Sequence, residues 1–213
     1  MASILVFGDS ISYGIADKEG GWVPKLRKFL ELDTDIKPNY DFIYNLSIPG
    51  DTSQTLLQRF TFEAMQRIDY PEETIVLFAF GINDSAYANI AAKPLVPEND
   101  FTDNVKDLVV KAKALKVQVA FLGLTQVDES RVNPCEWDKT VSYSNQLISK
   151  YNAIIKKICK EYDVYFIDIS DSFKPSPKLF LDDGLHPNSK GHDKIFDQVR
   201  QFFSKYVLVF KDK

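Results

Sequence analysis

A serine near the start of the sequence and a histidine near its end have the surroundings that nucleophilic catalysis requires. Ser10 follows a Gly-Asp pair directly after an apolar run, and His186 lies three residues after Asp183. A serine hydroxyl needs a base within hydrogen-bond reach, and the base needs a group that holds its tautomer. We therefore predict Ser10 as nucleophile, His186 as general base and then general acid, and Asp183 as the residue that orients the imidazole. The spacing favours Asp183 over its neighbour Asp182, because one turn puts Asp183 and His186 on the same side.

Attack on an acyl group also needs hydrogen-bond donors for the oxyanion that develops. Ser10 begins the turn after a predicted strand, so its own N–H is one candidate. Gly50 can bring its N–H close to a ligand because it has no side chain. Asn83 offers a side-chain NH₂ after another predicted strand. We expect Ser10, Gly50 and Asn83 to form the oxyanion hole.

Several residues near these positions also have a purely structural interpretation. A serine after a strand usually caps a helix, a role that fits Ser12. Asp9 is expected to brace its turn by accepting backbone N–H bonds. His192 is expected to be a surface or packing residue of the closing helix. Asn83 with Asp84, taken alone, fits an Asx turn. Such roles explain poorly why several strand ends carry donor, nucleophile and base residues together.

Apolar strands and amphipathic helices alternate along the chain and must position these residues. The predicted strands are residues 3–7, 42–46, 75–80, 117–122 and 164–169. The predicted helices are residues 21–32, a helix capped by Thr52 or Ser53 and reaching about residue 68, and residues 101–115, 141–161 and 189–205. Two irregular stretches, residues 85–100 and 125–140, interrupt the alternation.

This alternation predicts an α/β fold with one domain, residues 1–213, built as a three-layer α/β/α sandwich. Its core would be a flavodoxin-like, five-stranded parallel sheet with strand order 2-1-3-4-5. Ligands bind such sheets outside the carboxyl ends of the strands. The loops that carry Ser10, Gly50, Asn83 and the Asp183–His186 pair all follow predicted strands, so we expect them to meet at one rim.

Composition narrows the classes of partner. The chain has 213 residues, 45% of them hydrophobic, and a formal net charge of −4 without a dominant basic segment, which argues against nucleic acid. No apolar run approaches the ~20 residues that span a bilayer, so no stable membrane insertion is expected. The first residues lack a signal-peptide pattern, which predicts a cytoplasmic location. Nothing in the sequence excludes a homo-oligomer.

The two cysteines and the last apolar stretch carry less information. Cys135 and Cys159 match no metal spacing and fit buried thiols in a reducing compartment, with a disulfide as the alternative. No metal and no other cofactor is expected. The apolar stretch Tyr206–Phe210 is compatible with a last strand, a packed tail or an interface.

Four blocks of the sequence, taken in order, resemble the SGNH hydrolases, also called the GDSL esterase/lipase family. The blocks are Gly8-Asp9-Ser10-Ile11-Ser12, Asn45 to Gly50 with Asp51-Thr52, Gly81-Ile82-Asn83-Asp84, and Asp183-Gly184-Leu185-His186-Pro187. Ile11 replaces the leucine of the name motif. The resemblance implies a metal-free Ser-Asp-His hydrolase whose oxyanion hole contains Gly50 and Asn83. It also implies carboxylesterase, lysophospholipase, thioesterase or carbohydrate deacetylase activity, and does not choose among them.

Substrate size is expected to depend on the two irregular stretches. Residues 86–97 are rich in small and apolar side chains, and Trp137, Val141 and Tyr143 lie in or just after the second stretch. If these side chains wall the site, the substrate is a small ester with a short or medium acyl group. A carbohydrate O-acetyl ester, a lysophospholipid or a thioester is the alternative within the same chemistry.

A different class of function is a non-catalytic, flavodoxin-like module. The turn from Gly8 to Ser12 precedes a predicted helix, and helix N-termini offer N–H groups to phosphate. Such a module would bind a phosphate or a nucleotide there. The charge of Asp9 argues against this alternative, because it would repel phosphate.

Overall fold

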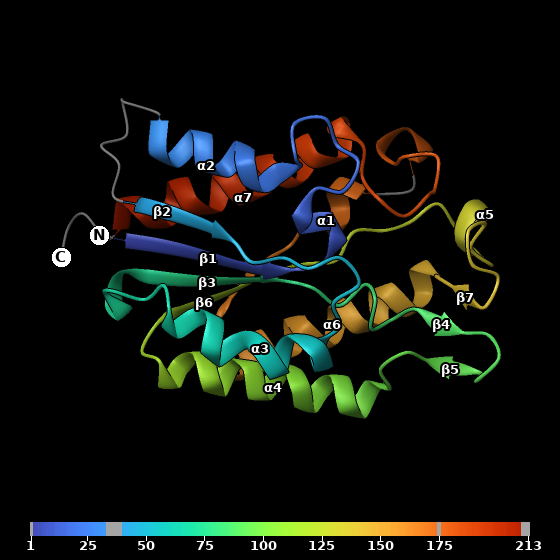
Figure 1. The fold of residues 1–213 in the computed structure, drawn as a ribbon, viewed down its shortest axis with the longest axis horizontal. Coiled ribbons are helices and arrows are strands. Elements are labelled where there is room, and N and C mark those ends of the chain that lie inside the picture. Colours follow the sequence, from blue (N-terminus) through green and yellow to red (C-terminus); the bar gives the residue numbers. More distant parts are fainter. Residues whose placement is uncertain (1, 33–39, 174–175, 210–213) are drawn as a thin grey trace.

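A five-stranded parallel sheet runs through the middle of the molecule in the computed structural model, which describes residues 2–32, 40–173 and 176–209 (Figure 1). The strands are β1 Ala2–Gly8, β2 Tyr40–Asn45, β3 Thr74–Ala79, β6 Gln118–Leu122 and β8 Tyr165–Ile167. Their order is β2-β1-β3-β6-β8, and each neighbouring pair is parallel. The predicted α/β fold and the predicted strand order 2-1-3-4-5 are therefore confirmed.

The central strands are apolar along their length because both faces of the sheet are covered. Every residue of β3 is buried, and the β1 side chains from Ile4 to Phe7 are fully buried. Continuous apolar runs of this kind are typical of parallel strands that lie between two layers of helices.

Helices form the two outer layers (Figure 1). Helices α2 (Trp22–Leu32) and α7 (Ser189–Val209) pack together on one face. Helices α3 (Ser53–Met65), α4 (Glu98–Ala114) and α6 (Asn145–Glu161) cover the other face. The shorter helices are α1 Ser10–Tyr13 and α5 Glu129–Val132, with 3-10 turns η1 Pro71–Glu73, η2 Ser170–Phe173 and η3 Pro177–Leu179.

Aromatic rings connect the sheet to the α3 layer. Phe60 of α3 lies 5.1 Å from Phe7 of β1 and 5.2 Å from Phe78 of β3, measured between ring centroids. Phe78 in turn lies 4.9 Å from Phe121 of β6. Tilted and edge-on ring pairs at these distances add to the free energy gained by burying the rings. The strands that lead to the candidate site are therefore packed closely against α3 and against one another.

A second, small sheet was not expected. It has the order β5-β4-β7 and consists of β4 Tyr87–Ala88, β5 Lys93–Pro94 and β7 Val141–Ser142. Both pairings are antiparallel, so the stretches at 85–100 and 125–140 are not simply irregular loops. The prediction that a helix begins at residue 141 is wrong, because residues 141–142 pair with β4 and the Ser144 side chain caps α6 by accepting from Leu147 N.

Other predicted boundaries change by a few residues, and two of these changes concern the start of α4 and the end of α7. Helix α4 begins at Glu98 instead of residue 101, with Pro97 just before it. Helix α7 continues to Val209, so residues 206–209 belong to the closing helix and do not form a last strand. Phe210, the end of that apolar stretch, lies outside the described residues. No helix within the described residues has the length and hydropathy of a membrane span.

Candidate active site

The structure brings Ser10, His186 and Asp183 into one line of hydrogen bonds. Ser10 Oγ lies 2.9 Å from His186 Nε2, and His186 Nδ1 lies 2.6 Å from Asp183 Oδ2. The other carboxylate oxygen of Asp183 accepts from the backbone N–H groups of Leu185 (2.8 Å) and His186 (2.9 Å). Since an ionised carboxylate only accepts, Nδ1 carries a proton, and in the neutral imidazole Nε2 is then free to accept the proton of Ser10. This arrangement suits activation of a serine hydroxyl.

Ser10 is held at the start of α1, immediately after β1. Asp9 is the N-cap of this helix, and its side chain accepts from Ile11 N over 3.0 Å. Asp9 thus braces the turn as predicted, whereas the capping role considered for Ser12 is wrong, because Ser12 lies inside α1. A Cβ atom on Gly8 would lie 2.7 Å from Ser12 Cβ and 2.8 Å from Ala79 O, which explains the glycine before the turn.

The His186 loop is fixed by contacts with α5 and by its own ends. An isolated bridge joins Phe180 and Pro187, and Leu181 N donates to His186 O over 2.8 Å. Gly184 has a φ of +73° and packs against α5 so closely that a Cβ would lie 2.8 Å from Arg131 Cβ. The loop conformation therefore requires glycine between Asp183 and His186.

The two neighbouring aspartates, Asp182 and Asp183, make different contacts. The side chain of Asp183 contacts His186, whereas the backbone oxygen of Asp182 accepts a hydrogen bond from the Arg131 guanidinium. Burial raises the pKa of Asp183, but the hydrogen bonds from His186 and Leu185 outweigh burial and lower its pKa overall. Asp183 is therefore the carboxylate suited to face an imidazolium.

The predicted oxyanion donors lie on neighbouring loops. Asn83 is 8% exposed, and its Nδ2 donates to the backbone oxygen of Asp51 over 2.9 Å, next to Gly50. Gly50 is exposed and has a φ of +83°, and a Cβ atom added to it would meet no other atom within 4 Å. The left-handed backbone, and not crowding, is thus what requires glycine at residue 50.

Acidic side chains support these loops in ways that the sequence pattern did not indicate. Both carboxylate oxygens of Asp84 accept from Ser53 N at the start of α3, at 2.8 and 3.1 Å. Asp51 accepts from Arg59 Nε over 2.8 Å and from Thr55 Oγ1 over 2.9 Å. The Asx turn considered as an alternative for Asn83 with Asp84 would be a local bond, whereas the contact between Asp84 and Ser53 spans 31 positions and joins two strand-end loops.

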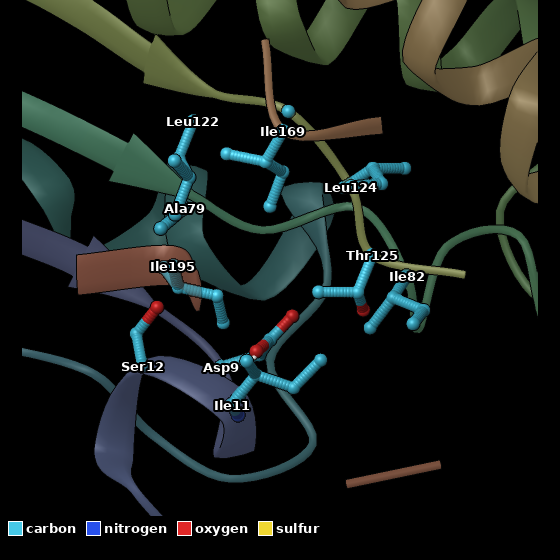
Figure 2. Close-up of a pocket in the computed structure, with 11 residues that line it drawn as sticks. Asp9, Ile11, Ser12, Ala79, Ile82, Leu122, Leu124, Thr125, Ile169 and Ile195 are labelled. Carbon is cyan, nitrogen blue, oxygen red and sulfur yellow. Dashed lines mark hydrogen bonds between the residues drawn. The ribbon is translucent and has the colours of Figure 1, made fainter. Parts of the chain in front are cut away.

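Asp9 adjoins a small cavity of about 20 Å³, room for about one water molecule (Figure 2). Figure 2 shows its carboxylate and the Thr125 hydroxyl among mainly aliphatic side chains, which come from the ends of β3 and β6, from the segment after β8 (Ile169) and from helices α1 (Ile11) and α7 (Ile195). The Thr125 hydroxyl has no hydrogen-bond partner among the described residues. Burial raises the pKa of Asp9 to about 7, although the N–H of Ile11 and the charge of His186 act in the opposite direction.

The three residues predicted to line the substrate pocket differ in how far they are buried. Trp137 is 52% exposed, and Val141 is half-buried in β7. Tyr143 is buried, and its hydroxyl lies 3.3 Å from Asn83 Oδ1. Among the described residues, only Tyr143 of the three is therefore hydrogen-bonded to Asn83, one of the predicted oxyanion donors.

The remaining titratable candidates lie in the interior. His192 is 1% exposed, so it is a packing residue and the surface alternative is wrong. Its ring nitrogens have no partner within the described ranges, and burial lowers its pKa to about 4. Cys135 and Cys159 are buried free thiols, so the disulfide alternative is wrong. No group of metal-ligating side chains gathers in the part of the chain that the structure describes.

Comparison with known proteins gives a consistent family and fold. The sequence profile described as "GDSL-like Lipase/Acylhydrolase family" matches residues 6–194. The chain is 25% identical to the isoamyl acetate-hydrolyzing esterase of Saccharomyces cerevisiae over 70% of this chain, but the match spans only 66% of that protein. It is 23% identical to the human isoamyl acetate-hydrolyzing esterase 1 homolog over 96% of this chain and 82% of that protein.

Two solved structures share the fold. The lipase/acylhydrolase from Enterococcus faecalis superposes with a TM-score of 0.73 at 20% identity, covering 97% of each chain. A catalytic mutant of Axe2, an acetylxylan esterase from Geobacillus stearothermophilus, superposes with a TM-score of 0.72 at 18% identity, covering 94% of this chain and 93% of that one.

Asp9→Asn is expected to stabilise the fold more at pH 8 than at pH 5. The folded-state pKa of about 7 lies above the ordinary value of 3.8, so the stability of the natural protein falls as pH rises through this window. Asparagine still accepts from Ile11 N but does not ionise. Thermal unfolding of both proteins at both pH values gives the increase in the free energy of unfolding caused by the substitution. This increase should be larger at pH 8 than at pH 5 by on the order of 2 kcal/mol.

Asp183→Asn is the control for this measurement, because its effect on stability should depend on pH in the opposite direction. Because the folded-state pKa of Asp183 is lowered below 3.8, its contribution is present above that value and is lost as pH falls. This variant should be less stable than the natural protein at pH 7, and the difference should narrow in acid. Equal gains for Asp9→Asn at pH 5 and pH 8 would contradict the buried, charge-sensitive role of Asp9.

Proposed function

The chain belongs to the GDSL-like lipase/acylhydrolase family, a family of ester-bond hydrolases, and we propose that it is a serine esterase that cleaves small acyl esters through an acyl-Ser10 intermediate. The observation that carries the proposal is the 2.9 Å contact between Ser10 Oγ and His186 Nε2, with Asp183 on the opposite side of the imidazole. A serine, its base and the group that orients the base are the minimum for this chemistry.

In the proposed first half-reaction, Ser10 Oγ bonds to the ester carbonyl carbon while its proton passes to His186 Nε2. The carbonyl electron pair moves onto oxygen, and the resulting imidazolium is stabilised by Asp183 at 2.6 Å. The tetrahedral intermediate then collapses. The alcohol leaves with the proton from Nε2, and the acyl group remains on Ser10.

Water completes the second half-reaction. It gives a proton to His186 Nε2 as its oxygen attacks the acyl carbon, and a second tetrahedral intermediate forms. Collapse of this intermediate breaks the bond to Ser10 Oγ, which takes the proton back. The carboxylic acid is released and the serine hydroxyl is restored, so no cofactor enters either step.

The oxyanion of both intermediates is proposed to accept from Ser10 N–H, Gly50 N–H and Asn83 Nδ2. Support comes from the bond between Asn83 Nδ2 and Asp51 O, which brings the amide to the residue after Gly50 and uses only one of its hydrogens. Arg59 and Thr55 hold the Asp51 side chain, so the loop is supported from α3. Rigid donors of this kind stabilise developing charge without reorganisation.

A short acyl group is the proposed substrate feature. Tyr143 is buried with its hydroxyl 3.3 Å from Asn83 Oδ1, and Val141 pairs with Ala88 in the small sheet. Both side chains are proposed to limit the acyl group that fits beside the oxyanion donors. The yeast and human relatives are named for isoamyl acetate, an ester of this size, and the Axe2 structure is named for an acetylxylan ester. Trp137, at 52% exposure, is proposed to contact the alcohol portion.

Ser10→Ala is expected to lower kcat for p-nitrophenyl acetate by several orders of magnitude, because the acyl acceptor is removed. A fluorophosphonate should label the natural protein at Ser10, as peptide mass spectrometry would show. Ser12→Ala is the matched control, since Ser12 is a buried serine in the same helix, and it should retain most of the turnover. Full turnover by Ser10→Ala would remove the basis of the proposal.

Asp183→Asn is expected to lower kcat/KM about 10⁴-fold, because the histidine loses the group that holds its tautomer. Asp182→Asn should stay close to the natural protein, since Asp182 contributes its backbone oxygen to Arg131 and this oxygen is unchanged. Steady-state kinetics on the same ester compare the two variants. The reverse order of effects would show that the wrong carboxylate has been assigned.

An ester series is expected to favour short acyl groups. Acetate and butyrate esters of p-nitrophenol should have kcat/KM at least about tenfold above the octanoate ester, because extra methylenes do not fit. Measuring acetate release from acetylated xylose tests the alcohol portion of the ester while the acyl group stays the same. Release well above that from p-nitrophenyl acetate would shift the proposal to a carbohydrate O-acetyl esterase, and preference for octanoate would contradict the short-acyl assignment.

The non-catalytic alternative can be tested with the same preparation. Equilibrium dialysis against FMN and common nucleotides measures binding at the turn that begins at Asp9. Tight binding without labelling of Ser10 would favour a phosphate-binding module. The raised pKa of Asp9 weakens the charge argument against phosphate only below about pH 7, where the carboxyl is protonated.

A further inference from the structure

The Asn83 amide lies between two groups that define its orientation. Its Nδ2 donates to Asp51 O over 2.9 Å, and its Oδ1 lies 3.3 Å from the Tyr143 hydroxyl. A backbone carbonyl only accepts, so the amide nitrogen must face Asp51. The amide oxygen therefore faces Tyr143, and the tyrosine hydroxyl is the donor in that contact.

This orientation matters for the proposed chemistry. The NH₂ group carries two hydrogens, and the bond to Asp51 uses one of them, which leaves the other for a ligand. A half-turn of the amide would bring Oδ1 against Asp51 O. The same half-turn would present an oxygen, and not a donor, to an oxyanion, so it would replace attraction with repulsion.

We propose that Tyr143 is a positioning residue whose hydroxyl holds the Asn83 amide with its NH₂ group directed at the oxyanion. The inference rests on the proposed function, in which Asn83 is an oxyanion donor. The hydroxyl acts through Asn83 and does not touch the reacting atoms. Its bond to Oδ1 also polarises the amide, which makes the free N–H a better donor.

The backbone around Tyr143 is fixed well enough to serve this purpose. Tyr143 N donates to Val132 O over 2.9 Å, and the preceding Ser142 pairs with Tyr87 in the small sheet. Cys135 N donates to Val141 O over 2.9 Å. The strand β7 and the turn after α5 thus determine where the tyrosine ring enters the interior.

Burial also keeps the hydroxyl in its donor form. Tyr143 and Asn83 are 7% and 8% exposed. Burial raises the pKa of Tyr143, and the nearby Cys135 and Asp9 act in the same direction. The phenol therefore stays protonated throughout the pH range in which a histidine base would work, and Oδ1 always has a donor.

Tyr143→Phe tests the inference because it removes the donor and keeps the ring. We expect kcat for p-nitrophenyl acetate to fall about tenfold, with KM within about twofold, because the lost alignment affects the oxyanion more than the bound ester. Tyr151→Phe is the matched control. It removes another buried tyrosine hydroxyl, which donates to Val96 O over 2.5 Å, and should reduce thermal stability while leaving kcat unchanged.

A double-mutant cycle with Asn83→Ala separates the inference from the proposed function. Asn83→Ala alone should lower kcat by about 10²–10³, and adding Tyr143→Phe should cause no further loss. A fully active Asn83→Ala enzyme would refute the oxyanion assignment itself. If Asn83→Ala is impaired but Tyr143→Phe is not, or if Tyr143→Phe has the same effect in both backgrounds, only the positioning role is refuted.

Discussion

The hydrogen bond between Ser10 and His186 joins residues 176 positions apart, and it depends on the sheet and on the loop that follows β8. Strand β1 carries Ser10 to the rim because it pairs with β2 on one side and β3 on the other. The loop with His186 returns to the same rim after β8, and the bridge between Phe180 and Pro187 fixes its ends. Local structure alone could not hold the two side chains at 2.9 Å, so the sheet is what makes the contact.

Buried carboxylates are the second constraint at this rim. The charges of Asp84 and Asp51 raise the pKa of Asp9, and the charge of Asp51 raises that of Asp84. Each of the three carboxylates accepts hydrogen bonds from the backbone or from side chains. Burial raises the pKa of Asp84 to about 6 and that of Asp9 to about 7. Negative charge on these carboxylates disfavours further negative charge nearby. The proposed oxyanion donors would therefore have to act against an acidic surrounding.

Strand-end position was the informative signal in the sequence. Ser10 and Asn83 stand where a buried, continuous apolar strand stops, so topology alone predicted that they would share a rim. The small sheet could not be predicted, because strands of two residues have no periodicity and because β7, one of the partners of β4, lies far from it in sequence. The same reason hides the bond between Tyr143 and Asn83, which spans 60 positions. Asp9 caps α1, and Ser12 does not, because the helix begins at Ser10. The amino-acid composition of this segment does not specify where the helix begins.

The order of these residues along the chain has a consequence for synthesis. Ser10 leaves the ribosome first, and at 5–20 residues per second about 10–35 s pass before His186 follows. During that interval the nascent chain carries a serine without its base. No N-terminal fragment that stops before His186 can form the hydrogen bonds from Ser10 to His186 and Asp183, so under the proposed function a truncated translation product has no esterase activity. Esterase activity of this protein would therefore indicate that the chain has been synthesised beyond His186 and has folded so that Ser10 and His186 are in contact.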